Sequence, residues 1–436
     1  MHRLRSGSPR SGMLRAAGQL ASGAAAAQVV SFFASLAYAR LFAPEEMGLY
    51  ALVLAVEGMF GGVLSLRYEA MLVTEPSTTR ALALCRVCLR FVAVVGTVAA
   101  LGCAAVYHLL RGETLLLAVP MLGLLWLRGL IGVLDSWNNR SRDYGLMAGV
   151  TVARALAQAA VSVVLGALGC GAWGLVLGHC LGLVCGVYRQ AGPLLRLLPE
   201  MRAIPREAMR SVIRTHRRQA LYATPAAFAN RFAYQLIPLL LEALSGPAAL
   251  GCYTMANKAL SLPLNVLSGS MSRVFFREAG DAYHRTGQFR RPFRRVSVFM
   301  ALAAAAMSAA VVLLAPGAFR LLYGARWADC GTMARLMVPM LAARLVASSV
   351  AGSLQLTGRQ RQELALQGMM AAMTLGCGVL GARLGWPMEA LLGSVSLCLA
   401  LGYGAVWCCA ARAAGVQGAA HPIRRGCHQQ FEHSRE

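Results

Sequence analysis

The sequence predicts an all-α polytopic membrane protein with about twelve transmembrane helices. Three observations predict it: 57% of the 436 residues are hydrophobic, only 14% are charged, and long apolar runs recur along the whole chain. A soluble domain has about 45–50% apolar and about 25% charged residues. The composition therefore excludes an ordinary soluble enzyme, a disordered chain and a disulfide scaffold.

The expected spans follow one another along the chain, since a membrane-spanning helix needs about 20 mostly apolar residues. Twelve segments meet this requirement: 20–39, 46–66, 91–110, 115–137, 145–168, 172–188, 221–243, 252–276, 296–319, 329–355, 364–382 and 388–410. The first follows a basic stretch that has no acidic residue, and it starts with small and polar residues. We therefore expect it to be retained as a span rather than removed as a signal peptide.

The basic residues indicate how the chain is oriented. The 42 Lys and Arg residues exceed the 18 Asp and Glu residues and give a net charge of +24. With a cytoplasmic N-terminus, the twelve spans leave 30 basic residues inside, 5 outside and 7 within the spans. Cytoplasmic loops of membrane proteins carry such an excess. Both termini are therefore predicted to be cytoplasmic, and the charge does not indicate nucleic-acid binding.

The longest connection, residues 189–220, holds eight arginines and divides the chain. The predicted parts are a basic cytoplasmic segment at 1–19, a six-helix lobe at 20–188, this connector at 189–220, a second six-helix lobe at 221–410 and a cytoplasmic tail at 411–436. The apolar residues of the connector include Leu194, Leu195, Leu197, Leu198, Met201 and Ile204. They fit an amphipathic stretch lying on the anionic inner leaflet, and a plain basic tether between the lobes fits equally well.

An internal repeat relates the two predicted lobes. Residues 41–50 read LFAPEEMGLY and residues 244–253 read LSGPAALGCY, and four identities fall at one offset of 203 residues. Both copies lie on the external turn between the first and second span of a lobe. Because each lobe has an even number of spans, the two are expected to be parallel repeats, as in transporters that alternate access. The sequence thus predicts two pseudo-symmetric six-helix bundles around a central cleft.

Charged side chains within the spans indicate what the cleft binds. A charge at the centre of a bilayer costs at least about 2.5–3.5 kcal/mol, so it usually faces a cavity or a partner. The candidate substrate-binding residues are Arg231, Lys258, Arg128, Arg344, Gln235 and Asn265. Basic groups outnumber acids in this interior set, so the cargo is expected to be anionic, and the arginine fork suits phosphate. An internal ion pair or snorkelling to a headgroup is the open alternative for each arginine.

Polar side chains also recur at helical spacing on the first two spans of each lobe. They are Gln28, Ser31, Ser35 and Tyr38; Tyr50, Glu57, Gly61 and Ser65; Thr224, Arg231, Gln235 and Glu242; and Lys258, Ser261, Asn265, Ser268 and Ser272. A polar stripe at this period marks one face of a helix. We expect each of these faces to line the cleft.

Glu57 is the acid that lies deepest in the predicted membrane. Two roles stay open for it: a proton or cation site that couples transport to a gradient, or a structural salt bridge. His179 is expected to be a hydrogen-bonded packing residue. No metal, cofactor or catalytic residue is expected, since Cys85 and Cys88 form one isolated CxxC and most of the 13 cysteines lie in apolar runs.

Several motifs resemble those of one family. The turn holding Arg40, Leu41, Pro44, Glu45, Gly48 and Tyr50, followed by Arg67, Tyr68 and Glu69, is similar to the opening helices of Wzx-like oligosaccharide flippases and polysaccharide exporters of the MOP superfamily. In the second half, Asn230, Gln235 and Pro238, then residues 251–276 and 324–339, look like later helices of the same family. Lys258 matches a position where the family usually has Arg or Lys.

The resemblance implies a flippase rather than an enzyme. Such proteins move polyprenyl-pyrophosphate-linked oligosaccharides to the outer leaflet for assembly of O-antigen in lipopolysaccharide, capsule or exopolysaccharide. The expected location is the bacterial cytoplasmic (inner) membrane, with membrane lipids, a polysaccharide polymerase and other assembly proteins as partners. A drug or cation antiporter of the same superfamily is the first alternative, although that class typically has an acid-rich cavity. A polymerase or ligase is the second, although short external connections leave it no catalytic loop.

Overall fold

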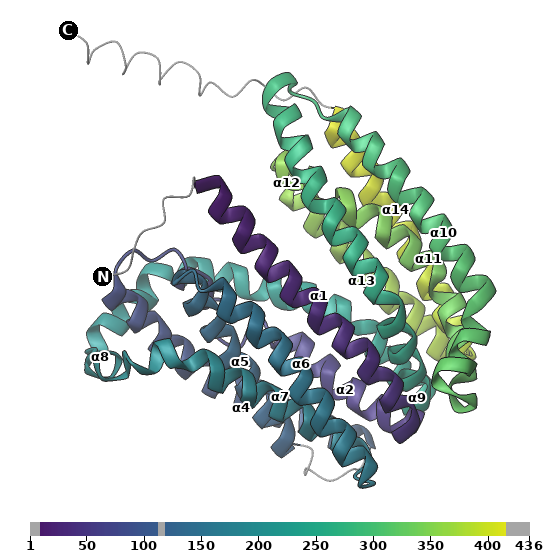
Figure 1. The fold of residues 1–436 in the computed structure, drawn as a ribbon, viewed down its shortest axis with the longest axis horizontal. Coiled ribbons are helices and arrows are strands. Elements are labelled where there is room, and N and C mark those ends of the chain that lie inside the picture. The colour runs from purple at the N-terminus through teal and green to yellow at the C-terminus, as the bar shows by residue number, and fades with distance from the viewer. Residues whose placement is uncertain (1–8, 112–117, 416–436) are drawn as a thin grey trace. The chain divides into compact units, whose positions relative to one another are not determined.

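A computed structural model describes residues 9–111 and 118–415, which contain helices and no strand. The helices are α1 (Pro9–Leu41), α2 (Pro44–Phe60), α3 (Glu69–Leu72), α4 (Thr78–Arg111), α5 (Ala118–Arg140), α6 (Tyr144–Ala167), α7 (Ala172–Leu195), α8 (Leu198–Ala203), α9 (Arg206–Thr286), α10 (Arg290–Tyr323), α11 (Ala328–Val350), α12 (Gly352–Leu356), α13 (Gln360–Leu384) and α14 (Met388–Gly415) (Figure 1). The predicted all-α class is confirmed. Parts of the predicted segments 1–19, 115–137 and 411–436 lie outside the described residues.

The predicted spans account for the long helices. Within the described residues, ten helical stretches are long and apolar enough to cross a membrane. Nine of them overlap one predicted span each, and the tenth, Ala227–Tyr283, covers the two predicted spans of α9. The remaining predicted span corresponds to α2, which has 17 residues and is at the short limit for crossing a bilayer. The chain is therefore a multi-pass membrane protein.

A single glycine separates the two spans within α9. Gly246 has φ 81° and ψ 177°, a conformation that interrupts the helix. Such a positive φ strains any residue with a Cβ atom, so glycine is the residue that adopts it readily. Pro247 follows and favours an extended residue before it, which Gly246 supplies. The external turn expected at residues 244–253 is therefore a kink between two nearly continuous helices.

The predicted span 46–66 differs from the structure because its helix stops early. Helix α2 ends at Phe60, and residues 61–68 form successive tight turns before α3 begins. Leu66 and Arg67 have φ values of 52° and 64°, in the left-handed region. Irregular backbone at membrane depth persists only where protein or water satisfies its polar groups. The adjacent pair Gly61 and Gly62 opens this break, which the apolar pattern of the sequence does not reveal.

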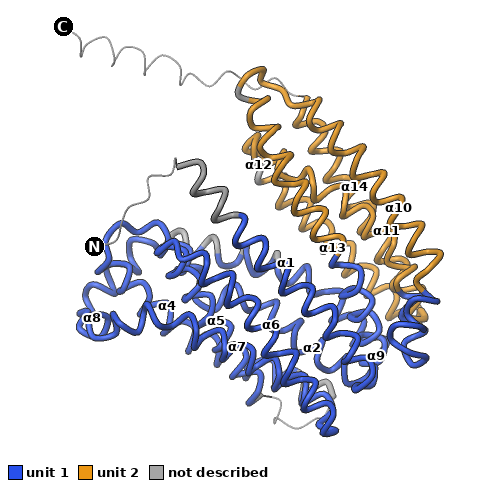
Figure 2. Tube along the Cα trace, viewed as in Figure 1, with its two compact units in different colours: residues 1–262, 316–333 blue, residues 263–315, 334–436 orange. Residues whose placement is uncertain are grey.

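The described chain forms two compact units (Figure 2). Unit 1 comprises residues 1–262 and 316–333, and unit 2 comprises residues 263–315 and 334–436. In unit 1, α6 packs against α1 and α7, and α5 packs against α4 and α7. In unit 2, α13 packs against α14. These boundaries are not those of the predicted lobes at 20–188 and 221–410, and the division into lobes stays a prediction.

Side-chain hydrogen bonds join the helices of unit 2. The indole of Trp407 on α14 donates to the Ser297 hydroxyl on α10 at 3.1 Å. The Met340 amide on α11 donates to the Ser396 hydroxyl on α14 at 3.2 Å. A buried hydroxyl that accepts such a bond avoids the cost of an unpaired polar group in an apolar surrounding. The sparse polar groups of this bundle are thus used to fix its helix contacts.

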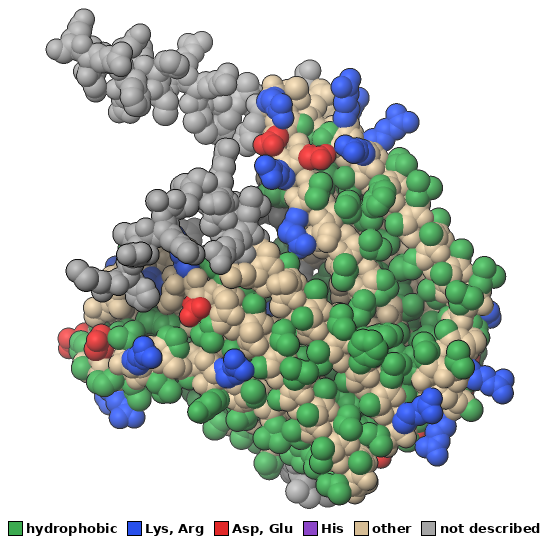
Figure 3. Space-filling model, viewed as in Figure 1, with side chains coloured by type: hydrophobic (Ala, Val, Ile, Leu, Met, Phe, Trp, Pro, Cys, Tyr) green, Lys and Arg blue, Asp and Glu red, His purple; other side chains and the backbone are tan. Residues whose placement is uncertain are grey.

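The outer flanks of the long helices are apolar. Figure 3 shows hydrophobic side chains over most of the visible surface, with comparatively few charged groups between them. On α10, Leu302, Leu313 and Leu321 are 66%, 74% and 79% exposed. Water would penalise so large an exposed apolar surface, whereas lipid chains solvate it. These flanks are the lipid-facing surface of the protein.

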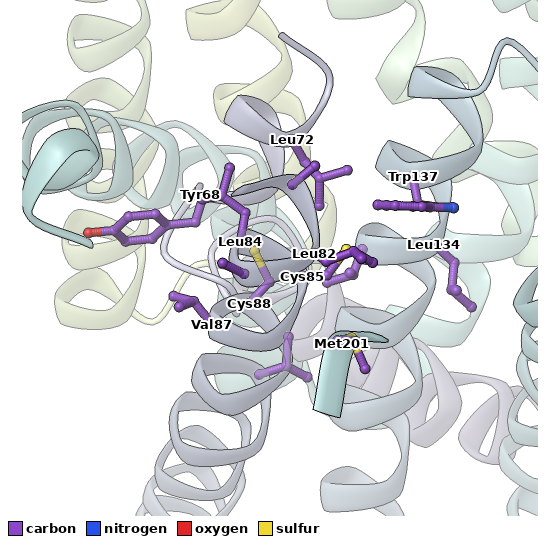
Figure 4. Packing of buried hydrophobic residues seen from close by; sticks show 14 of the residues in the cluster. Tyr68, Leu72, Leu82, Leu84, Cys85, Val87, Cys88, Leu134, Trp137 and Met201 are labelled. Carbon is purple, nitrogen blue, oxygen red and sulfur yellow. The ribbon is translucent and has the colours of Figure 1, made fainter. Parts of the chain in front are cut away.

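The connector packs onto the protein instead of lying free. Its residues Leu194, Met201 and Ile204 are buried, together with Met209 and Val212 of α9, in one cluster with residues of α3, α4 and α5. Figure 4 shows part of this cluster, including Met201, Trp137 and Leu134. Of the two alternatives left open for the connector, packing on the leaflet does not hold for these three residues, because they are buried against protein. Cys85 and Cys88 are fully buried in the same cluster and serve as small hydrophobes, as expected.

One arginine holds the end of α8 in place. Nη1 of Arg86 donates to three backbone carbonyls, those of Met201 at 3.4 Å, Arg202 at 3.1 Å and Ile204 at 2.9 Å. These are carbonyls at the C-terminus of a short helix, where no further turn can satisfy them. A cation at this position therefore both pairs the carbonyls and opposes the helix dipole.

We expect Arg86→Ala to loosen the connector. Loss of a charged hydrogen-bond donor costs about 1.5–3 kcal/mol, enough to raise the open population of this segment about tenfold or more. Limited proteolysis between residues 196 and 217 should accelerate correspondingly. Arg90→Ala is the matched control, because Arg90 lies one turn further along α4 and is exposed. Equal cleavage rates for both variants would contradict the assignment.

Candidate functional site

A buried ion-pair network lies at the centre of unit 1, around Glu57 of α2. The Glu57 side chain is only 8% exposed. Its Oε1 lies 3.3 Å from Nε of Arg128 on α5, and its Oε2 lies 2.9 Å from Nε2 of His179 on α7. A buried carboxylate is retained when paired and hydrogen-bonded in this way. Glu57 therefore joins three helices of the unit.

His179 extends the network toward α6. Its Nδ1 lies 3.2 Å from the hydroxyl of Tyr50, and Nε2 of Gln158 donates to that hydroxyl at 2.7 Å. The imidazole thus bridges the Tyr50 phenol and the Glu57 carboxylate. The prediction of a hydrogen-bonded His179 is correct, but its role as the partner of Glu57 was missed. The available signal was that His179 is the one ionisable side chain of span 172–188 besides cysteine and tyrosine.

A second polar group lies nearer the predicted cytoplasmic end of the unit. Nε2 of Gln190 on α7 donates to Oδ1 of Asp135 on α5 at 2.7 Å. Arg154 of α6 lies within electrostatic range of both Asp135 and Glu57. The two acids therefore balance Arg128 and Arg154. The open alternative of an internal ion pair is the one that the structure shows for Arg128.

Two glycines, one in α2 and one just after it, let long polar side chains lie directly on the backbone. A methyl group built on Gly58 would overlap the amide of Gln235, and one built on Gly62 would overlap the guanidinium of Arg231. Nη1 of Arg231 also donates to the Gly58 carbonyl at 3.4 Å. Arg231 and Gln235 both come from α9, so this glycine surface brings the two predicted site residues to the break that follows α2.

The segment after the break carries the Arg-Tyr-Glu motif. Arg67 and Glu69 lie 3.9 Å apart, and the Ser65 hydroxyl donates to the Glu69 carboxylate. Tyr68 is buried, stacks on Phe91 with ring centroids 5.5 Å apart, and donates its hydroxyl to the carbonyl of Ile213. The tyrosine therefore anchors the irregular segment to the N-terminal part of α9. Aromatic stacking and one buried hydrogen bond explain why this position suits tyrosine.

Lys258 of α9 is a cation without an acidic partner among the described residues. Its Nζ lies 5.1 Å from the centroid of the Tyr38 ring on α1, a cation–π geometry. Tyr38 itself is almost fully buried. An ammonium group held by an aromatic face alone keeps its charge available to an anion. Lys258 therefore differs from Arg128, whose charge is already paired.

The two remaining predicted site residues belong to unit 2. Asn265 is exposed on α9, and Arg344 is half-buried on α11. Neither has an ion-pair or side-chain hydrogen-bond partner in the described part of the chain. The structure thus brings together Arg128, Arg231, Gln235 and Glu57 in unit 1, with Lys258 elsewhere in that unit. For Asn265 and Arg344 the place in the site stays a prediction.

The polar stripes of the first two predicted spans are protein contacts. On α1, Ser35 is buried and its hydroxyl lies 3.3 Å from the Tyr323 hydroxyl. On α2, Tyr50, Glu57 and Ser65 are all buried. The expectation that these faces line the cleft stays a prediction, although the groups named here already have protein partners within unit 1. Helical period identifies a polar face but does not tell a cavity from a polar helix contact.

The two copies of the repeat touch each other reciprocally. A methyl group built on Gly48 would overlap the Pro247 carbonyl oxygen, and one built on Gly251 would overlap the Pro44 carbonyl oxygen. Each copy thus offers its glycine to the proline of the other. Reciprocal contacts of this kind are what a local two-fold axis produces. The matching glycines and prolines therefore reflect close backbone approach as well as turn chemistry.

The sequence comparison decides the family. A family profile described as "Polysaccharide biosynthesis protein" matches residues 37–332, more than half of the chain. The chain belongs to this polysaccharide biosynthesis protein family. The matched range includes Glu57, Arg128, Arg231 and Lys258, whereas Arg344 lies beyond it. No curated protein shows significant sequence similarity to the chain.

Solved structures with the same fold are MOP superfamily transporters. An inward-facing multidrug resistance MATE family transporter has 15% identity and a TM-score of 0.59, with 92% of this chain and 96% of that chain covered. The lipid II flippase MurJ in an inward closed conformation has 11% identity and a TM-score of 0.62, with 87% and 84% covered. A MOP superfamily transporter from Pyrococcus furiosus has 15% identity, a TM-score of 0.52, and 91% and 94% covered. The family member thus has the MOP fold, and the resemblance is confirmed.

Proposed function

We propose that this polysaccharide biosynthesis family member is a flippase for anionic, polyprenyl-pyrophosphate-linked oligosaccharides. It would move single units from the cytoplasmic to the outer leaflet for assembly of O-antigen, capsule or exopolysaccharide. The two predicted lobes, 20–188 and 221–410, would alternate access. One observation carries the proposal: Arg231 and Lys258 have no acidic partner at ion-pair distance among the described residues. Cations left uncompensated within membrane spans need an anion, and the family is one of polysaccharide biosynthesis.

The chemistry of the substrate assigns a role to each candidate residue. Arg231, Lys258, Arg128 and Arg344 would neutralise the pyrophosphate, with Arg forks binding its oxygens in pairs. Gln235 and Asn265 would hydrogen-bond the sugars. Glu57 would couple transport to an ion gradient. The polyprenyl chain would stay in lipid beside the apolar flanks.

The cellular setting follows from the same proposal. The protein would lie in the bacterial cytoplasmic membrane with both termini inside, since that orientation places most arginines in the cytoplasm. Its partners would be the lipid-linked oligosaccharide, surrounding lipids and a polysaccharide polymerase with other assembly proteins. The fold relatives are transporters, so no catalytic step is assigned to it.

A deletion strain tests the function directly. Lipid-linked oligosaccharide is extracted, and its sidedness is probed with an impermeant glycan-modifying enzyme on intact spheroplasts. Single units that accumulate and are protected from the enzyme are expected. Units accessible on the outer face would indicate a polymerase, and unchanged glycan with altered drug sensitivity would indicate an antiporter.

Replacing either uncompensated cation is expected to reduce export. Lys258→Ala and Arg231→Ala should each lower the export rate at least about tenfold, since a charged hydrogen bond is worth about 1.5–3 kcal/mol. Lys258→Arg and Arg231→Lys should retain more activity than the alanine variants, because charge matters more than shape in a mobile site. Arg206→Ala, at an exposed position of α9, is the control. Export is measured against the amount of folded protein, and normal export by both alanine variants would refute the role.

A further inference from the structure

The two members of the central ion pair differ in accessibility. The Arg128 side chain is 36% exposed, whereas that of Glu57 is 8% exposed. Arg128 uses Nε toward Glu57, and its two terminal nitrogens have no hydrogen-bond partner among the described residues. The forked end of an arginine is the part that binds phosphate oxygens in pairs. An anion can therefore reach Arg128 without reaching Glu57.

Two more arginines lie near this accessible guanidinium. The Arg128 side chain runs along Gly61, where a methyl group would lie 3.0 Å from Cγ, and Arg231 lies on the adjacent Gly62. Arg231 is within electrostatic range of Arg128 and Arg67 and of one acid, Glu69, which pairs with Arg67. Nε of Arg67 is buried without a hydrogen-bond partner. Three guanidinium groups thus lie around the break after α2. Those of Arg128 and Arg67 have nitrogen atoms without a hydrogen-bond partner among the described residues.

We propose that Arg128 is shared between two partners: it pairs with Glu57 when the site is empty and with the diphosphate of the substrate when the site is loaded, so that each bound anion brings a proton onto the Glu57–His179 pair. The inference rests on the proposed function for the identity of the anion. It adds Arg67 to the anion site. The coupling ion is then a proton, which binds because Glu57 loses its guanidinium partner.

The groups around Glu57 explain why a proton binds when Arg128 turns away. Arg128 on α5 and His179 on α7 contact its carboxylate, and Arg154 on α6 acts at longer range. Tyr50, on the same helix as Glu57, and Cys180 on α7 are the other titratable groups near it. Helix α2, which carries Glu57, also packs on α4, and α4 adds no charged partner to Glu57 within the described residues. From α9, Gln235 and Arg231 lie against Gly58 and Gly62.

The charge balance of the exchange is simple. When Arg128 turns to the diphosphate, the buried Glu57 carboxylate loses its guanidinium, which is costly in an apolar surrounding. One proton taken from the aqueous side then binds between Oε2 of Glu57 and Nε2 of His179, which are 2.9 Å apart. The proton returns to water when the anion leaves and Arg128 pairs with Glu57 again. By linkage, protons must tighten anion binding as much as the anion tightens proton binding.

The test uses an anion that cannot itself titrate. Methanedisulfonate resembles a diphosphate in shape and carries two fixed charges, so any proton taken up on binding enters the protein. Calorimetric titration of the purified full chain in buffers of different ionisation enthalpy, at one pH near neutrality, gives the number of protons per anion. We expect an uptake approaching one for the wild type. Arg67→Ala should weaken binding about tenfold while keeping that uptake.

Two glutamate variants separate this exchange from general effects of charge. Glu57→Gln should bind methanedisulfonate at least as tightly as the wild type but take up no proton. Glu75→Gln is the matched control, because Glu75 is 7% exposed and also pairs with an arginine and a histidine, Arg80 at 3.5 Å and His216 at 3.7 Å, in the loop before α4. It should keep the wild-type uptake.

The outcomes distinguish the site from the function. Wild-type binding without proton uptake overturns the proposal whatever the variants do, and so does a failure of the wild type to bind methanedisulfonate. Proton uptake that persists in folded Glu57→Gln also overturns it. If proton-linked binding is found but the deletion strain accumulates no protected lipid-linked glycan, the anion site stands and the flippase function fails.

Discussion

Gly251→Val is expected to abolish most of the folded protein or its transport. The Gly251 Cα lies against the Pro44 carbonyl, and a Cβ atom there would also lie 3.0 Å from the Gly48 amide nitrogen. Both obstructing atoms are backbone, so no side-chain rotation relieves the overlap. Overpacking typically costs about 1–3 kcal/mol and more where the neighbours cannot move. Membrane yield, monodispersity on size exclusion and export measure the effect.

The controls for this prediction are other helical glycines. Gly132 on α5 and Gly149 on α6 have open space at the position of a Cβ atom. Alanine at either site should be neutral or stabilise by about 0.5–1 kcal/mol, since glycine weakens a helix interior. Gly251→Ala should instead be strongly destabilising, and Gly48→Ala should match it because the contact is reciprocal. A well-folded, active Gly251→Ala variant would contradict the prediction, because it would show that this close backbone contact contributes nothing to stability.

Arg128→Met is expected to be the most destabilising single change in the ion-pair network. It leaves the Glu57 carboxylate, 8% exposed, with His179 as its remaining direct partner. Removing one member of a buried pair costs about 3–5 kcal/mol, and we expect about 3 kcal/mol because Arg128 is partly exposed. Glu57→Leu should cost less, since the Arg128 side chain can turn toward water. The midpoint of thermal unfolding in detergent gives the order of the variants.

The double variant decides whether the pair itself is responsible. Arg128→Met with Glu57→Leu removes both charges, so it should be more stable than Arg128→Met alone. It should nevertheless fail to transport, because the proposed anion and proton sites are both lost. Strictly additive destabilisation would mean that Arg128 and Glu57 do not interact in solution.

The membrane spans were predictable because each depends on local composition. Length and hydropathy identify α6 and α13 within a few residues, and the reason is that a bilayer imposes one thickness on every span. The break after Phe60 was not predictable in this way. Residues 61–66 stay apolar enough to extend a span, and the left-handed conformation of Leu66 and Arg67 arises from tertiary contacts that sequence periodicity does not encode.

The site was predictable in its residues but not in its pairing. Arg128, Arg231, Gln235 and Glu57 were identified because polar groups within spans are rare and expensive. Which of them pair depends on how α2, α5, α7 and α9 pack, and that is information from distant parts of the sequence. His179 was underestimated for this reason, since nothing local indicates that Glu57 lies within 2.9 Å of it.

The burial of the connector bears on the order in which the protein matures. Leu194, Met201 and Ile204, with Met209 and Val212, complete the apolar cluster beside α4 and α5. A nascent chain that ends at residue 188 therefore exposes an unfinished surface at the membrane face, although six spans have already been inserted. This cluster is complete only after the start of α9 has left the ribosome. Splitting the gene for two-fragment expression should thus succeed beyond residue 217 and fail at the end of the sixth span.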